Sequence, residues 1–127
     1  MFNSFKLRTN WYVKTAPAAD SIFIDRSGEY TLGVTDPLTR TVYLSEDLQG
    51  ILLTRVLIHE IAHCCMIDYN LIEMIHRLCK PRYWVEAEEW VCNFIADYGI
   101  LIFQAAYSVL GEDALGIVPY ELEVMFK

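Results

Sequence analysis

The first third of the chain alternates apolar and polar residues with a period of two, which is typical of half-buried strands. The clearest strand candidates are residues 21–25 (SIFID), 29–35 (EYTLGVT) and 40–44 (RTVYL), and residues 11–13 could form another short strand. Asp36 and Pro37 begin a stretch with the residues of a type I turn between the last two candidates. We therefore expect a small antiparallel sheet of about three strands.

The periodicity becomes helical after the last of these strands. Ser45 can cap a helix that runs from about residue 48 to about residue 68, and two acidic residues follow it at the positive N-terminal end. Asn70 marks a break in the pattern. A short second helix is predicted over 71–79 and is stopped by Pro81.

A long helical pattern then covers about residues 83–110. Gly111 is a plausible stop, and Gly99 could bend or divide the helix. Pro119 could open a last short helix. Strands come first and helices second, which predicts an α+β fold in which the sheet packs on a helical bundle. We expect one domain covering residues 1–127, since this length suits a single core.

The first predicted helix carries a stripe of polar residues on an otherwise apolar surface. Residues 51–67 are apolar on nearly every side, so we expect a central, buried helix. Arg55, His59 and His63 are spaced by four and share one stripe, with Glu60 at its edge. Burying such groups without partners costs on the order of a few kcal/mol each. A metal ion would satisfy them; the alternative is that both histidines are hydrogen-bonded core residues.

The segment HEIAH has the spacing of a catalytic metal site. Histidines at i and i+4 project side by side, so His59 and His63 can reach one ion. Glu60 is then placed to hold a water molecule rather than to bind the metal. A catalytic ion needs a third protein ligand. The remaining histidine, His76, is a weaker candidate, and a surface or supporting position suits it better.

The third predicted helix offers carboxylates for the third ligand. Glu86, Glu88 and Glu89 cluster in the segment VEAEEWVCNFIADYG. Glu89 and Asn93 are four apart and share a face. A solvated surface is the simpler interpretation of three glutamates, and we expect it for Glu88. Spacing alone does not decide between Glu86 and Glu89.

These motifs resemble those of a known group of enzymes. HEIAH followed by a glutamate on a later helix is similar to the gluzincin metallopeptidases, and residues 89–96 (EWVCNFIA) resemble the E-x-x-A-N-x-F-A motif of the ImmA/IrrE family. The resemblance covers roughly residues 40–98. It implies a zincin-like fold and a Zn²⁺ ion held by His59, His63 and Glu89, with Asn93 supporting a zinc-binding histidine. DYGILIF replaces the usual end of the family motif.

The resemblance also implies an activity, that of a zinc-dependent metallo-endopeptidase. Glu60 would be the general base, and Tyr98, Arg55 and His76 are candidate donors to the oxyanion. The strand at 40–44 could bind an extended substrate by β-augmentation. The substrate implied is a transcriptional repressor or another regulatory protein in a bacterium, phage or mobile element. The alternatives are a catalytically silent zinc-binding protein that sequesters a partner and a helical core protein without a metal.

Composition narrows the classes of partner and compartment. The net charge of −7 argues against non-specific binding to nucleic acid. The N-terminal residues hold no apolar stretch of signal-peptide length, and the uncharged stretch at 98–111 is too short to span a bilayer. The four cysteines form no CxxC pair, so we expect reduced core thiols. We predict a cytoplasmic protein with no membrane partner, and the oligomeric state stays open.

Overall fold

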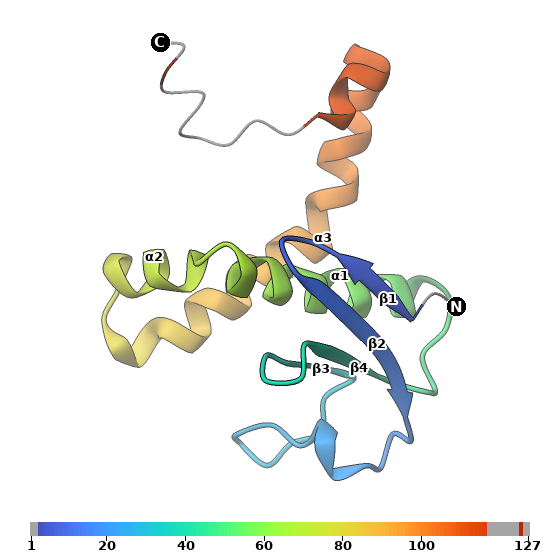
Figure 1. Cartoon of the computed structure of the whole chain (residues 1–127), viewed down its shortest axis with the longest axis vertical. Helices are drawn as coiled ribbons and strands as arrows, with labels where there is room; N and C mark the ends of the chain where they lie inside the picture. The colour runs from blue at the N-terminus through green and yellow to red at the C-terminus, as the bar shows by residue number, and fades with distance from the viewer. Residues whose placement is uncertain (1–2, 117–124, 126–127) are drawn as a thin grey trace. The chain divides into compact units, whose positions relative to one another are not determined.

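The structure, a computed structural model, describes residues 3–116 and 125. The chain divides into two compact units, Met1–Asp97 and Tyr98–Lys127. The first unit contains the sheet, two helices and the beginning of a third (Figure 1). The single domain expected over 1–127 stays a prediction. The last short helix predicted from Pro119 lies outside the described residues.

The sheet has four strands and is mixed. Its strands are β1 (Ser4–Lys6), β2 (Asn10–Ala16), β3 (Gly33–Asp36) and β4 (Thr41–Ser45). The order is β1-β2-β4-β3; β2 and β4 are parallel, and the other two pairs are antiparallel. The α+β class is therefore confirmed, but the antiparallel sheet of about three strands is wrong. The chain between β2 and β3 returns to the sheet so that β4 runs in the direction of β2.

Residues 21–25 do not form the predicted strand. Ser21–Phe23 is a 3-10 turn, because the Asp20 side chain accepts a hydrogen bond from the Ile22 N–H at 2.9 Å. Ile24 keeps one isolated bridge to Tyr30, and the strand predicted to begin at residue 29 begins at Gly33 instead. The residues of this segment alternate in polarity, but only one of their side chains, the Phe23 ring, is buried in the core.

The predicted turn between the last two strands is present. Asp36 Oδ1 accepts a hydrogen bond from the Leu38 N–H, and Asp36 Oδ2 accepts one from the Thr39 hydroxyl, both at 2.9 Å. These local bonds close the hairpin that joins β3 to β4, as expected for Asp at the first position of a turn.

Three α-helices follow the sheet. They are α1 (Gly50–Asp68), α2 (Leu71–Leu78) and α3 (Trp84–Leu110). Ser45 ends β4, and the N-terminal cap position of α1 is Gln49, so the predicted capping role of Ser45 is wrong. Asn70 makes the break between α1 and α2 in a left-handed conformation, with φ 57°. The helical conformation of α3 continues through Gly99 and ends before Gly111.

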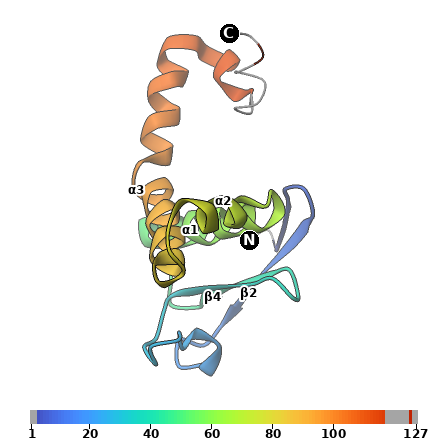
Figure 2. The same ribbon diagram turned by 90° about the vertical axis from the view of Figure 1, so that its left-hand side faces the viewer.

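Helix α1 lies between two apolar clusters. Trp11, Val42 and Leu44 of the sheet pack with Cys64 on one side of it, while Ala62 and Met66 pack with α2 and α3 on the other. Figure 2 shows α1 and α2 stacked above β2 and β4. The expected burial holds only for the second half of the helix. Ile51, in its first turn, is 90% exposed.

Among the described residues, two helical segments are long and apolar enough to cross a membrane, Gly50–Asp68 and Pro81–Leu115. The first of them is α1, whose second half packs in the core and buries Glu60, His63 and Asp68. The core helix of a soluble protein passes the same test of length and composition. The prediction that the protein has no membrane partner is therefore untested.

A buried aspartate fastens the end of α1 to the sheet. Asp68 accepts hydrogen bonds from the Thr9 N–H at 2.9 Å and the Trp11 indole at 3.0 Å, and it forms an ion pair with Arg40 at 2.7 Å. Burial alone would raise the pKa of Asp68, but these partners lower it below the usual 3.8. One carboxylate thus links α1 to the start of β2 and to the residue before β4.

Replacement of this carboxylate should destabilise the fold. We expect Asp68→Ala to lower the free energy of unfolding by about 3 kcal/mol, because it leaves the Trp11 and Thr9 donors unpaired. Urea unfolding at neutral pH measures this loss, and Asp47→Ala, at an exposed position, is the matched control. Since folding lowers the pKa of Asp68, its stabilisation is present above about pH 4 and is lost below it. A difference from the wild-type protein that does not shrink in acid would contradict this assignment.

Candidate metal centre

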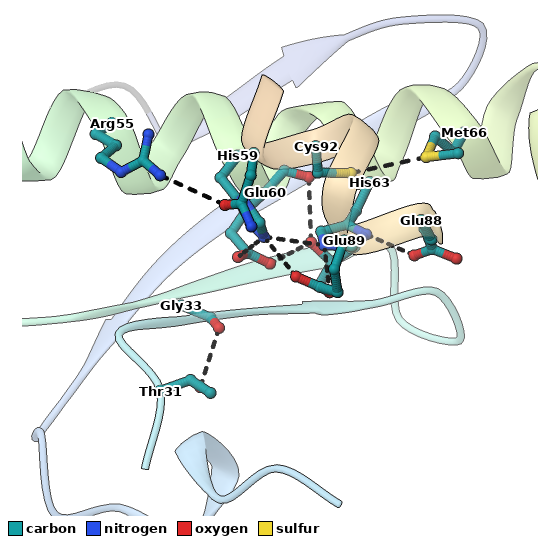
Figure 3. Close-up of polar contacts among 12 residues, drawn as sticks. Thr31, Gly33, Arg55, His59, Glu60, His63, Met66, Glu88, Glu89 and Cys92 are labelled. Atoms are coloured by element: carbon teal, nitrogen blue, oxygen red, sulfur yellow. Dashed lines mark hydrogen bonds and ion pairs between the residues drawn. The ribbon is translucent and has the colours of Figure 1, made fainter. Parts of the chain in front are cut away.

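Two histidines of α1 and one glutamate of α3 meet at a single point within the first unit. His59 Nε2 and His63 Nε2 lie 3.1 Å apart, as expected for rings one helical turn apart. Glu89 Oε2 lies 3.2 Å from His59 Nε2, and Glu89 Oε1 lies 3.0 Å from His63 Nε2. Figure 3 shows the three side chains converging between α1 and α3. The structure therefore brings together the predicted ligands from both helices.

The spacing of these atoms fits a small divalent ion. Ligands about 2.0–2.1 Å from zinc in a tetrahedral arrangement are about 3.3 Å from one another. The two ring nitrogens are 3.1 Å apart, and each lies 3.0–3.2 Å from one of the two Glu89 oxygens, close to that value. His59, Glu60 and His63 also lie near enough to form a ligand group. Glu60 Oε2 is 3.9 Å from His59 Nε2, however, so Glu89 is the better third ligand.

The charges around this point favour a cation. Hydrogen bonds from His59 and His63 lower the pKa of Glu89 well below its usual range, so the carboxylate is ionised. Burial alone would lower the pKa of His63, but hydrogen bonds with the Cys92 thiol and two glutamates raise it to about 12. The pocket thus stabilises positive charge between the two rings and Glu89. A divalent ion supplies that charge as well as a proton does.

Glu88 contacts the other nitrogen of the His63 ring. Its Oε2 lies 2.6 Å from His63 Nδ1, and its side chain is only 28% exposed. The expectation that Glu88 belongs to a solvated surface is therefore wrong. A carboxylate on Nδ1 fixes the ring and directs the Nε2 lone pair toward the ligand point, as outer carboxylates do at many zinc sites. The adjacent residues Glu88 and Glu89 thus contact opposite nitrogens of one imidazole.

Glu60 lies beside the cluster but is held by a different element. It is 6% exposed, and its Oε1 accepts a hydrogen bond from the Thr35 hydroxyl of β3 at 2.9 Å. Burial raises the pKa of Glu60, and the nearby His63 and Thr35 only partly oppose this shift. A carboxylate whose pKa is raised toward neutrality is a better proton acceptor and donor at physiological pH.

Arg55 and Asn93 form a separate polar contact at the edge of the site. Asn93 Oδ1 accepts a hydrogen bond from Arg55 Nη2 at 3.4 Å, and Arg55 also pairs with Asp97. No hydrogen bond joins Asn93 to either histidine in the part of the chain that the structure describes. The structure therefore gives the supporting contact on His63 to Glu88 rather than to the predicted Asn93.

The remaining predicted residues are His76, Glu86 and Tyr98. His76 is exposed and stacks on Trp84, with ring centroids 3.7 Å apart. Glu86 is exposed and does not line the groove that opens onto the cluster. Tyr98 is the first residue of the second unit, so it is not part of the unit that holds the cluster.

This groove is large and leads directly to the ligand point. Its volume is about 1130 Å³, and it is lined by β3 and the preceding segment and by all three helices. The lining is largely apolar: Ile24, Leu32 and Val34 lie on the strand side, and Ile72 and Val85 lie on the helix side. The three predicted ligands and Glu60 also line this groove, so a molecule bound there can reach the cluster.

No family model matches this chain, and no curated protein is significantly similar to it in sequence. The resemblance to the ImmA/IrrE family therefore stays a prediction from the motifs alone. The side-chain geometry at the cluster is an observation independent of that resemblance.

Removal of Glu89 should weaken metal binding far more than removal of Glu86. We expect Glu89→Ala to raise the zinc dissociation constant by at least about 100-fold, because an inner ligand is lost. Glu86→Ala, at an exposed position on the same helix, should change it less than about threefold. Calorimetric titration with Zn²⁺ gives both values. The opposite ranking would move the third ligand to Glu86.

Proposed function

We propose that this protein is a zinc-dependent metallo-endopeptidase of the gluzincin type with a zincin-like fold, related to the ImmA/IrrE family. The convergence of His59, His63 and Glu89 within 3.0–3.2 Å at the base of an apolar groove carries this proposal. Glu60 is adjacent to this cluster without joining it, which is the arrangement that metal-assisted hydrolysis needs.

The three ligands would hold the ion with a net positive charge. Two neutral imidazoles and the ionised Glu89 leave one charge of a divalent ion uncompensated. Bound zinc supplies Lewis acidity, polarising a substrate carbonyl and lowering the pKa of water toward about 7. Glu88 keeps the Nδ1 proton of His63 engaged, so that Nε2 stays a lone-pair donor.

Glu60 is the proposed general base. Its Oε1 is engaged by Thr35, while Oε2 lies 3.9 Å from His59 Nε2 and is the oxygen nearer to the ligand point. Oε2 takes a proton from the attacking water and passes it to the leaving amine. Burial of Glu60 supports the first transfer, because a raised pKa stabilises the protonated carboxyl that forms when Glu60 accepts the proton.

The substrate would lie along the groove in an extended form. β4 cannot accept it, because β4 pairs with β2 on one side and β3 on the other, so the predicted role of residues 40–44 in β-augmentation is wrong. β3 is an edge strand that lines the groove, and an extended segment could pair with it instead. Of the three predicted oxyanion donors, Arg55 lines the groove.

The motif resemblance supports a regulatory protein, such as a transcriptional repressor, as the substrate, in the cytoplasm of a bacterium or of a cell that carries a phage. The acidic net charge supports a protein rather than a nucleic-acid partner.

A second function is a zinc-binding protein that captures a partner without cleaving it. One exposed aromatic pair on α3 favours it: Trp90 and Phe94 stack with ring centroids 5.6 Å apart, and Trp90 is 68% exposed. Exposed aromatic anchors are typical of protein interfaces. Loss of hydrolysis on removal of the base distinguishes the two functions.

Glu60→Gln should keep the metal and lose the activity. We expect an unchanged zinc stoichiometry, because Glu60 is not a ligand, and a fall in kcat of at least about 100-fold, because the proton acceptor is gone. Atomic emission gives the zinc content, and mass spectrometry of an unfolded protein substrate and of candidate repressors gives the cleavage. Glu46→Gln, at an exposed position, is the matched control. An active Glu60→Gln protein would contradict the assignment of the base.

A further inference from the structure

β3 packs against α1 at the position of Glu60. Gly33 and Thr35 are two residues apart on this strand, so they face the same side. A Cβ atom on Gly33 would lie 2.8 Å from Val56 Cγ1 and 3.0 Å from Glu60 Cγ. Glycine is therefore what allows the strand to approach this part of the helix so closely.

Thr35 uses that close approach to contact the same side chain. Its hydroxyl donates to Glu60 Oε1 at 2.9 Å and lies 3.2 Å from the Glu60 carbonyl oxygen. A hydroxyl has one hydrogen, and the ionised carboxylate is the stronger acceptor. The strand thus contacts Glu60 through the Thr35 hydroxyl, and the absence of a side chain at Gly33 leaves room for the Glu60 Cγ.

This contact distinguishes the two oxygens of one carboxylate. Glu60 Oε1 is occupied by Thr35, and Oε2 is the oxygen turned toward His59. A free glutamate would populate several rotamers, each with its reactive oxygen at a different place. A base is effective only when its oxygen lies within hydrogen-bonding reach of the proton that it takes.

We propose that Thr35, brought close by Gly33, is a positioning residue that holds Glu60 by Oε1 and so leaves Oε2 to carry the proton. The kinetic part of this inference rests on the proposed function. The hydrogen bond between Thr35 and Glu60 is independent of that function, since it joins two side chains and needs neither zinc nor turnover.

A double-mutant cycle in zinc-free protein tests the hydrogen bond between Thr35 and Glu60. Thr35→Val, Glu60→Ala and the double variant are compared with wild type by urea unfolding. If Thr35 holds Glu60, the two changes should be non-additive by about 10-fold in the unfolding equilibrium constant. Thr41→Val is the matched control, a buried threonine of β4 whose hydroxyl bonds to the Thr39 carbonyl, and it should be additive with Glu60→Ala. Additivity of Thr35→Val with Glu60→Ala would overturn the inference.

Kinetic measurements test whether this hydrogen bond contributes to catalysis. Thr35→Val should lower kcat by about 10- to 100-fold while KM and zinc content stay near wild type, and Thr35→Ser should restore kcat to within about threefold. An unchanged kcat in Thr35→Val, or a Thr35→Ser protein as impaired as Thr35→Val, would overturn the positioning role. A wild-type protein that binds zinc but cleaves nothing would instead refute the proposed function. The double-mutant cycle would still show whether Thr35 and Glu60 interact.

Discussion

The buried polar face of α1 is the constraint on which the rest of the structure depends. Glu60, His63 and Asp68 are all nearly inaccessible to solvent, and each unsatisfied group would cost about 1–3 kcal/mol. Their partners come from three separate parts of the chain: Glu60 bonds to β3, His63 to α3, and Asp68 to Trp11 of β2. The same contacts that make burial tolerable also fix where the sheet and α3 lie against α1 within the first unit.

The candidate site is a consequence of this arrangement. α1 presents two imidazoles from one stripe, and α3 places adjacent carboxylates on either side of the His63 ring. β3 contributes no ligand, but its closeness at Gly33 and the hydroxyl of Thr35 orient Glu60. The proposed metal binding and the proposed positioning of the base therefore involve different elements, α3 and β3, although both act on neighbouring residues of one helix.

The features that could be predicted from the sequence are mostly local. The three helices, the turn at Asp36 and the break at Asn70 follow from periodicity and residue preference over a few positions. The i, i+4 pair in HEIAH requires only that the segment be helical. The parallel pairing of β2 with β4 could not be predicted, because local periodicity does not specify where the chain returns to the sheet. Glutamate usually lies at the surface, and only the packing of α3 on α1 turns Glu88 toward His63. Thr35 lies 25 residues before Glu60, and nothing in its neighbourhood marks it as a partner of a carboxylate.

The ligand set of the bound ion is the most direct test of the proposed metal centre. X-ray absorption spectroscopy on the chain loaded with one equivalent of Zn²⁺ reports the atoms around the metal. We predict uptake of one ion with nitrogen and oxygen neighbours at about 2.0–2.1 Å, including two imidazoles, and no sulfur at about 2.3 Å. Failure to take up zinc, or a sulfur neighbour from one of the buried cysteines, would contradict the assignment of His59, His63 and Glu89 as the ligands.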